Sequence, residues 1–265
     1  DPGNDRVSHW TIDWQDGIVQ TLTGATTSAS HLYQAKRSYA IAATAYVEDK
    51  PCTATQNVTV TNVPPVLQNL VARTVDEGGV SHLSGTIVDP GVQESHTLAI
   101  DWGDGSAPAS YALATGVKTF ELTHQYQDHP ASGTTYGIEA TVSDGEDSSS
   151  ANTDVTVNNV APLLNALKLS ETQADGVRST TLNGSFNDPG TQEAYTVLID
   201  WGDGNSSAAT PDPVRRSFTA THAYTLGTVN DSFTVVATVS DGLQSGAASI
   251  VSDGTKYQIP IARTV

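Results

Sequence analysis

The chain has 265 residues, and 12 lysines and arginines against 29 aspartates and glutamates give it a net charge of −17. A charge of this sign repels nucleic acids and anionic membranes, so we expect neither nucleic-acid binding nor membrane insertion. No apolar run approaches the roughly 20 residues that a membrane-spanning helix needs. Cys52 is the single cysteine, so an intrachain disulfide is excluded and we expect Cys52 to be an incidental surface residue.

Three copies of one ordered set of motifs organise the sequence. Each copy has Asp-Pro-Gly, then an Ile-Asp-Trp turn segment, then His-x-Tyr, then Val-x-Asp; the copies open at Asp1, Asp89 and Asp188 and carry Trp14, Trp102 and Trp201. In every copy the aspartate of Ile-Asp-Trp lies 12 positions after the opening aspartate. The tryptophans lie 88 and 99 residues apart, a period that is typical of a whole domain.

Short linkers separate the copies. Residues 62–65 read Asn-Val-Pro-Pro, and residues 159–162 read Asn-Val-Ala-Pro. Proline stiffens such a joint, so we expect a semi-rigid string of modules. The predicted modules span residues 1–64, 65–161 and 162–265.

Apolar residues alternate with polar ones at the same places in each copy. Before the tryptophan turn the alternating residues are Trp10, Ile12 and Trp14; Leu98, Ile100 and Trp102; and Val197, Ile199 and Trp201. Before the Val-x-Asp motif they are Ile41, Ala43, Ala45 and Val47; Tyr136, Ile138, Ala140 and Val142; and Phe233, Val235, Ala237 and Val239. A period of two places these side chains on one buried face of a strand. Together with the tight Gly-Asp-Gly turns, the pattern predicts an all-β fold of tandem two-sheet sandwiches.

The chain resembles the PKD-type (polycystic-kidney-disease) domains. The resemblance rests on the Trp-Gly-Asp-Gly turn, the His-x-Tyr strand and the Val-Ser-Asp-Gly hairpin, in that order, and covers nearly the whole chain. It implies an immunoglobulin-like β-sandwich found in large bacterial surface proteins, secreted hydrolases and animal receptors. Such modules act as spacers or adhesion and ligand-contact modules, are not catalytic, and some bind calcium. The first copy departs from the motifs at Gln15 and Lys50, each of which replaces a glycine.

Recurrent aspartates are the candidate ligands for calcium. They are Asp13, Asp16, Asp49, Asp89, Asp101, Asp104, Asp144, Asp188, Asp200, Asp203 and Asp241. A hard cation such as Ca²⁺ needs several oxygen ligands, which clustered carboxylates supply. The alternative interpretation is that each aspartate accepts hydrogen bonds from the backbone of its own turn. If calcium binds, the first copy is expected to bind it worst, because Gln15 and Lys50 interrupt its motifs.

The recurrent histidines and tryptophans have structural interpretations. His31, His124 and His222 are expected to be packed histidines, since no serine or cysteine nucleophile recurs beside them. One histidine per copy and one cysteine in all do not make a closed zinc site. The motif tryptophans fall on core stripes, and the alternative is a sugar-binding platform.

Four asparagines lie in Asn-x-Ser/Thr sequons, which matter only in a host that glycosylates them. They are Asn57, Asn183, Asn205 and Asn230.

The two ends of the chain do not coincide with module boundaries. The first copy opens at its Asp-Pro-Gly motif, so we expect that module to lack its first two strands and to leave an apolar face uncovered. Residues 257–265 run past the third copy, and residues 261–265 resemble residues 71–75. Either the sequence is a window on a longer array, or the last strand of one chain completes the first module of the next in a head-to-tail filament.

These features favour a non-catalytic, extracellular spacer or adhesion array within a larger surface or secreted protein. Its expected partners are the neighbouring repeats and a protein or polysaccharide ligand at a surface. The alternatives are accessory modules that bind carbohydrate or protein beside a secreted hydrolase, and the subunit of a strand-complemented filament. An enzyme is disfavoured, because three copies of one pattern offer no unique cleft with converging unlike groups.

Overall fold

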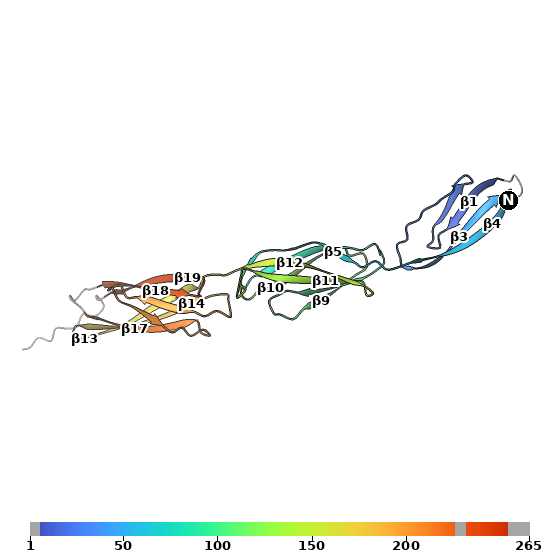
Figure 1. The fold of residues 1–265 in the computed structure, drawn as a ribbon. Helices are drawn as coiled ribbons and strands as arrows, with labels where there is room; N and C mark the ends of the chain where they lie inside the picture. The colour runs from blue at the N-terminus through green and yellow to red at the C-terminus, as the bar shows by residue number, and fades with distance from the viewer. Residues whose placement is uncertain (1–5, 226–231, 254–265) are drawn as a thin grey trace, which may run out of the picture. The chain divides into compact units, whose positions relative to one another are not determined.

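The computed structural model describes residues 6–225 and 232–253, and its regular structure in these ranges is β-strand (Figure 1). No helix that is long and apolar enough to cross a membrane occurs in the part of the chain that the structure describes. The Asp-Pro-Gly motif of the first copy, the sequon at Asn230 and the strand predicted over 257–265 lie outside these ranges.

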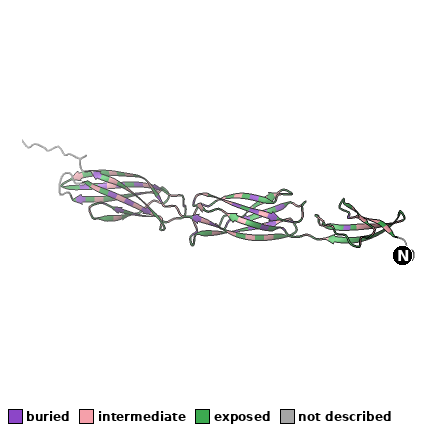
Figure 2. Cartoon of the chain, turned by 90° about the horizontal axis from the view of Figure 1, so that it is seen from above, coloured by how far each residue is buried: buried purple, intermediate pink, exposed green. Residues whose placement is uncertain are grey.

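The N-terminal segment forms one antiparallel sheet. Its strands are β1 (Val7–Asp13), β2 (Val19–Thr23), β3 (Arg37–Val47) and β4 (Lys50–Val60), in the order β2-β1-β3-β4. Trp14, Tyr39 and Ala45 are buried, whereas β4 is exposed along almost its whole length (Figure 2). Residues 6–60 therefore contain one sheet instead of two, as predicted for an incomplete first module.

The second segment forms two sheets. Its strands are β5 (Val66–Ala72), β6 (Val75–Asp76), β7 (Val80–Val88), β8 (His96–Asp101), β9 (Ala109–Leu113), β10 (Thr119–Gln125), β11 (Thr135–Ser143) and β12 (Ser148–Asn158). Their orders are β10-β7-β5 and β6-β12-β11-β8-β9. The pairing of β6 with β12 is parallel, whereas β8 pairs with β9 and β11 in antiparallel register.

The third segment repeats this plan. Its strands are β13 (Leu163–Ala174), β14 (Val177–Asn187), β15 (Thr196–Asp200), β16 (Ser206–Ala209), β17 (Ser217–Thr225), β18 (Ser232–Ser240) and β19 (Ser245–Asp253). The two sheets have the orders β13-β14-β17 and β16-β15-β18-β19, and one core cluster includes residues of both. The second and third segments are thus tandem immunoglobulin-like β-sandwiches, which confirms the predicted fold class.

The chain divides into two compact units that do not follow the predicted module boundaries. Unit 1 comprises residues 1–72, 82–122 and 137–154, and unit 2 comprises residues 73–81, 123–136 and 155–265. The boundaries 1–64, 65–161 and 162–265 stay a prediction.

The alternating stripes form the cores of both units. In unit 1, Leu98, Ile100 and Trp102 are at most 2 % exposed, and in unit 2 Val197, Ile199 and Trp201 are at most 3 % exposed. The stripes Ile138–Val142 and Val235–Val239 bury their alternate residues in the same way (Figure 2). In the first segment Trp14 is buried, but Trp10 and Ile12 are only half-buried, because no second sheet covers that face among residues 6–60.

The turn after each tryptophan strand requires a left-handed residue. Gly103 and Gly202 have φ of 77° and 78°, and an added Cβ would lie 2.2 Å from the carbonyl oxygen of Gly137 or 2.5 Å from that of Thr234. Gln15 takes the equivalent place at φ 64°. A side chain in this conformation costs about 1 kcal/mol, so the first copy keeps the turn at some cost in stability.

The hairpin at Asp49 is built differently from its counterparts. Glu48 and Asp49 have φ of 50° and 61°, and Val47 pairs with Lys50, which makes a two-residue turn. At Asp144 and Asp241 the aspartate instead accepts backbone N–H groups of a longer loop. Lys50 therefore replaces the motif glycine because this hairpin needs no left-handed residue there.

We expect Trp201→Ala to lower the free energy of unfolding by about 3–5 kcal/mol, because the ring is fully buried. Urea unfolding followed by circular dichroism measures the change. Val214→Ala is the control in the same segment, since Val214 is 90 % exposed and its truncation should change stability by less than about 0.5 kcal/mol. Equal effects of the two substitutions would contradict the placement of Trp201 in the core.

Candidate functional site

Two clusters of polar side chains recur beside the two linkers. The first cluster consists of Lys36, Asn62, Asp89, Glu94, His96 and Asp144, and the second of Glu77, His129, Asn159, Asp188, Glu193, Tyr195 and Asp241. Each contains the first linker residue, the aspartate of Asp-Pro-Gly, the glutamate five residues after it and the aspartate of Val-Ser-Asp. The first cluster lies within unit 1 and the second within unit 2.

The linker asparagine holds the Val-Ser-Asp aspartate in both clusters. Asn62 Nδ2 donates to Asp144 Oδ2 at 2.7 Å, and Asn159 Nδ2 donates to Asp241 Oδ2 at 2.9 Å. Burial raises the pKa of each aspartate, but the hydrogen bonds from the asparagine and the hairpin backbone outweigh it and bring the pKa below its usual value. Both aspartates are therefore held ionised.

The Asp-Pro-Gly loop brings a glutamate against the opening aspartate. Asp89 Oδ1 accepts the N–H of Gly91 at 2.7 Å, and Asp188 Oδ1 accepts that of Gly190 at 2.9 Å. A Cβ on either glycine would lie 2.2–2.4 Å from a carboxylate oxygen of the glutamate. A side chain at either position would therefore displace the glutamate carboxylate.

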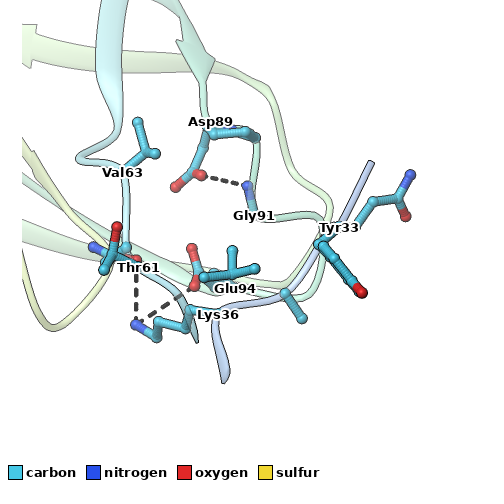
Figure 3. Close-up of a pocket in the computed structure, with 12 residues that line it drawn as sticks. Tyr33, Lys36, Thr61, Val63, Asp89, Gly91 and Glu94 are labelled. Carbon is cyan, nitrogen blue, oxygen red and sulfur yellow. Dashed lines mark hydrogen bonds and ion pairs between the residues drawn. The ribbon is translucent and has the colours of Figure 1, made fainter. Parts of the chain in front are cut away.

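In the first cluster, protein nitrogens face the carboxylates. Lys36 Nζ lies 3.5 Å from Glu94 Oε1 (Figure 3). It also lies 2.9 Å from Glu146 Oε2 and donates to Asn62 Oδ1 at 3.3 Å. His96 Nε2 lies 2.8 Å from Asp89 Oδ2, and both side chains are buried. Two nitrogen groups of the chain, the Lys36 ammonium and the His96 imidazole, therefore face the carboxylates of this cluster.

In the second cluster, a histidine lies three residues after the tyrosine of His-x-Tyr, where the first copy has Lys36. His129 Nδ1 is 2.9 Å from Glu77 Oε2 and 3.6 Å from Glu193 Oε1. The side chain of Glu77 is fully buried, and its Oε1 accepts the N–H of Val160 in the linker at 2.8 Å. The imidazole thus faces the carboxylates of Glu77 and Glu193, and Glu193 also lies with Asp188 and Asp241.

Three oxygens of the second cluster are buried and accept no hydrogen bond. They are Asn159 Oδ1, Asp188 Oδ2 and Glu193 Oε1, and the side chain of Glu193 is only 5 % exposed. A buried polar atom without a donor or a cation is costly, so these oxygens mark a place that a cation could fill.

The electrostatics of the second cluster agree with this geometry. Burial and the negative charges of Asp188 and Glu77 raise the pKa of Glu193 to about 7, although a hydrogen bond from Tyr195 lowers it. Burial also raises the pKa of Asp188. Both shifts arise first from burial, which favours the neutral form of each carboxyl group.

The remaining predicted ligands, apart from Asp49, cap turns. Asp13, Asp16, Asp101, Asp104, Asp200 and Asp203 each accept the backbone N–H two residues ahead at 2.8–3.2 Å. These contacts are those of the turn-capping alternative, and no group of possible ligands found in the described residues includes them or Asp49.

The structure brings together four of the predicted ligands in two pairs. Asp89 lies with Asp144 and Glu94, and Asp188 lies with Asp241 and Glu193. A third group, Glu77, His129 and Glu193, shares Glu193 with the second pair. Sequence reasoning missed the glutamates, although a glutamate five residues after Asp-Pro-Gly recurs in the second and third copies and could have indicated them.

The motif histidines pack on the tryptophans. The rings of His31 and Trp14, and those of His222 and Trp201, are stacked at 4.9 Å between centroids. His31 Nε2 lies 2.5 Å from Asp16, and His222 Nε2 lies 2.8 Å from Asp203. Each pair joins a core ring to the turn that follows it, and the burial of the motif tryptophans leaves no sugar platform made of these three side chains.

No protein-family model matches the chain, and the search of curated proteins found no match. Solved structures that resemble it include two fibronectin type-III domains of chicken tenascin, at 14 % identity and TM-score 0.39, which covers 71 % of this chain and 98 % of that one. The ICAM-5 D1–D4 ectodomain fragment has 16 % identity and TM-score 0.39, over 89 % and 63 %. The chicken CNTN1 FN1–FN3 domains have 8 % identity and TM-score 0.29, over 94 % and 90 %. A likeness at this level does not extend to function.

Asp203→Asn keeps an oxygen for the turn but removes the charge that faces His222. Burial raises the pKa of Asp203, whereas hydrogen bonds from His222 and Asn205 lower it below the usual value overall. A lowered pKa contributes stability above the ordinary carboxyl pKa, and that contribution is lost as the pH falls through the lowered value. We expect the variant to be less stable at about pH 6, by under about 1 kcal/mol, and equal to the wild type near about pH 2. Urea unfolding at both pH values measures this, and a pH-independent difference would contradict it.

Proposed function

We propose that the chain is a non-catalytic, extracellular array of PKD-type modules that acts as a structural spacer or adhesion element of a larger surface or secreted protein. The observation that carries the proposal is the twofold use of one linker scaffold. In both copies the linker asparagine and the Val-Ser-Asp aspartate are joined across 82 residues by the same hydrogen bond. A chain that holds modules in series needs the same connection at each linker.

Further hydrogen bonds join the second copy to the start of the third. Asp128 accepts the N–H groups of Thr191 and Gln192 at 2.5 and 2.9 Å, and the Thr191 hydroxyl at 2.8 Å. Glu77 accepts the N–H of Val160 in the linker. These contacts support a semi-rigid connection, which suits a spacer better than a flexible tether.

The motif side chains support a non-catalytic role. The histidine and aspartate pairs at His31 and His222 are stacked on core tryptophans and hold turns, so their contacts serve the fold. The buried motif tryptophans disfavour the alternative of a carbohydrate-binding accessory module that uses them as a platform. The filament alternative depends on residues 257–265, which lie outside the described ranges, and stays a prediction.

A spacer should resist force, and single-molecule force spectroscopy of the whole chain tests this. We expect separate unfolding events for the segments that contain Trp102 and Trp201, each adding on the order of 30 nm of extended chain. Trp201→Ala is the control, since it should weaken one event and leave the other. Unfolding at negligible force, together with saturable binding to members of a polysaccharide panel, would favour the accessory module instead.

We further propose that calcium stiffens the array at its acidic clusters. Carboxylate and amide oxygens are the ligands that Ca²⁺ prefers, and the net charge of −17 favours cation uptake. A cation held only by the folded state stabilises that state by mass action, by about 2.7 kcal/mol at 100 times its Kd.

Thermal melting in calcium and in chelator tests the proposed ion. We expect a higher midpoint in calcium for the wild type and for Asp200→Asn, because Asp200 caps a turn. Asp241→Asn should reduce the shift, since Asp241 lies among the clustered carboxylates. Identical midpoints of the wild type with and without calcium would leave the clusters with a purely structural role.

A further inference from the structure

The two clusters share the same three oxygen-bearing positions but differ in the side chains that face these oxygens. Each presents a linker amide oxygen, an Asp-Pro-Gly carboxylate oxygen and a glutamate oxygen from corresponding positions. The first cluster has Lys36 and His96 where the second has His129 and Tyr195, at the same offsets from the motifs. These two positions decide which donors the three oxygens meet.

In the first cluster each of the three oxygens has a nitrogen partner. Lys36 Nζ donates to Asn62 Oδ1 at 3.3 Å and pairs with Glu94 Oε1 at 3.5 Å. His96 Nε2 lies 2.8 Å from Asp89 Oδ2. The Lys36 ammonium thus contacts both the Glu94 carboxylate and the Asn62 amide oxygen, as a bound cation would.

In the second cluster the corresponding three oxygens, Asn159 Oδ1, Asp188 Oδ2 and Glu193 Oε1, are buried and accept no hydrogen bond. His129 is engaged with Glu77 and stays 3.6 Å from Glu193 Oε1. The Tyr195 hydroxyl donates to the other glutamate oxygen, Oε2, at 2.8 Å.

The nearby guanidinium of Arg216 does not supply the missing donor. It donates to the main-chain carbonyl oxygens of Asp188 and Gly190. Asp188 Oδ2 therefore remains without a donor, although Arg216 lies beside the loop.

We infer that the second cluster holds a divalent, oxygen-seeking cation, Ca²⁺ by its donor set, and that Lys36 and His96 take the place of that ion in the first cluster. The inference rests on the calcium role proposed above and assigns it to one of the two linkers. The oxygens of Asn159, Asp188 and Glu193 face the ion, and Asp241, held by Asn159, completes an acidic set whose ligand atoms, with those of Asp188 and Glu193, lie within 4.8 Å of one another. An amide oxygen with three carboxylates suits a hard cation.

A shared proton is the competing explanation. One proton between Asp188 and Glu193 would also relieve the repulsion of two buried carboxylates. It would leave Asn159 Oδ1 without a donor, whereas a bound cation would give Asn159 Oδ1, Asp188 Oδ2 and Glu193 Oε1 a common partner. The two explanations differ in whether calcium binds near neutral pH.

Calorimetric titration of the whole chain with Ca²⁺, at about 0.15 M salt to screen surface charge, tests the assignment. We expect one specific site in the wild type. Glu193→Gln should weaken it at least tenfold, and the matched variant Glu94→Gln should leave it unchanged. Circular dichroism and melting in chelator verify that both variants fold.

Exchange of the two positions provides the converse test. His129→Lys with Tyr195→His should abolish the site without lowering the melting midpoint in chelator, because the ammonium and imidazole replace the ion. Lys36→His with His96→Tyr should create a second site. An equal loss in Glu94→Gln and Glu193→Gln, or two sites in the wild type, would overturn the inference and leave the proposed calcium role intact. Absence of both calcium heat and a melting shift in the wild type would overturn both.

Discussion

A buried carboxylate must face a donor or a cation, and this constraint shapes the linker regions of the chain. The Asp-Pro-Gly loop places a glutamate against an aspartate, and the linker asparagine adds a second aspartate, so each linker gathers three acidic groups. The cost of desolvating them is offset only when positive charge or hydrogen-bond donors reach every oxygen. The first cluster meets this requirement with Lys36 and His96, whereas the second leaves three oxygens without hydrogen bonds.

The same constraint explains the contacts of the aspartates in the turns that follow the tryptophan strands. Asp200 and Asp203 flank a tight turn and accept its backbone N–H groups, and Asp203 also faces His222. Their oxygens are satisfied locally, at the end of a strand whose tryptophan is buried. These aspartates therefore hold turns, whereas each cluster at a linker also contains acidic residues that are distant in sequence, such as Asp188 and Asp241.

The array is a repeat whose copies have diverged at a few decisive positions. Gln15 keeps the left-handed turn of Gly103 and Gly202 without a glycine, and the hairpin at Asp49 has become a two-residue turn. Both changes preserve the strands. The second also replaces the longer hairpin loop that holds Asp144 and Asp241 in the other copies. The chain therefore contains two linkers with the same scaffold. The first has the ammonium of Lys36 beside its carboxylates, and the second has no ammonium at that place.

The sequence by itself determined the strands, the buried tryptophans and the sandwich architecture, because alternation of period two and tight turns are local properties. It also indicated which aspartates recur, but not which of them meet. Asp188 and Asp241 are 53 residues apart in the sequence, and Asn159 and Glu77 each lie still farther from Asp241. Only the packing of the sheets and linkers brings these residues together. The tertiary structure alone decided that Lys36 faces Glu94 and that Glu193 lacks an equivalent ammonium, since the partner of a buried charge depends on which distant residue occupies the space beside it.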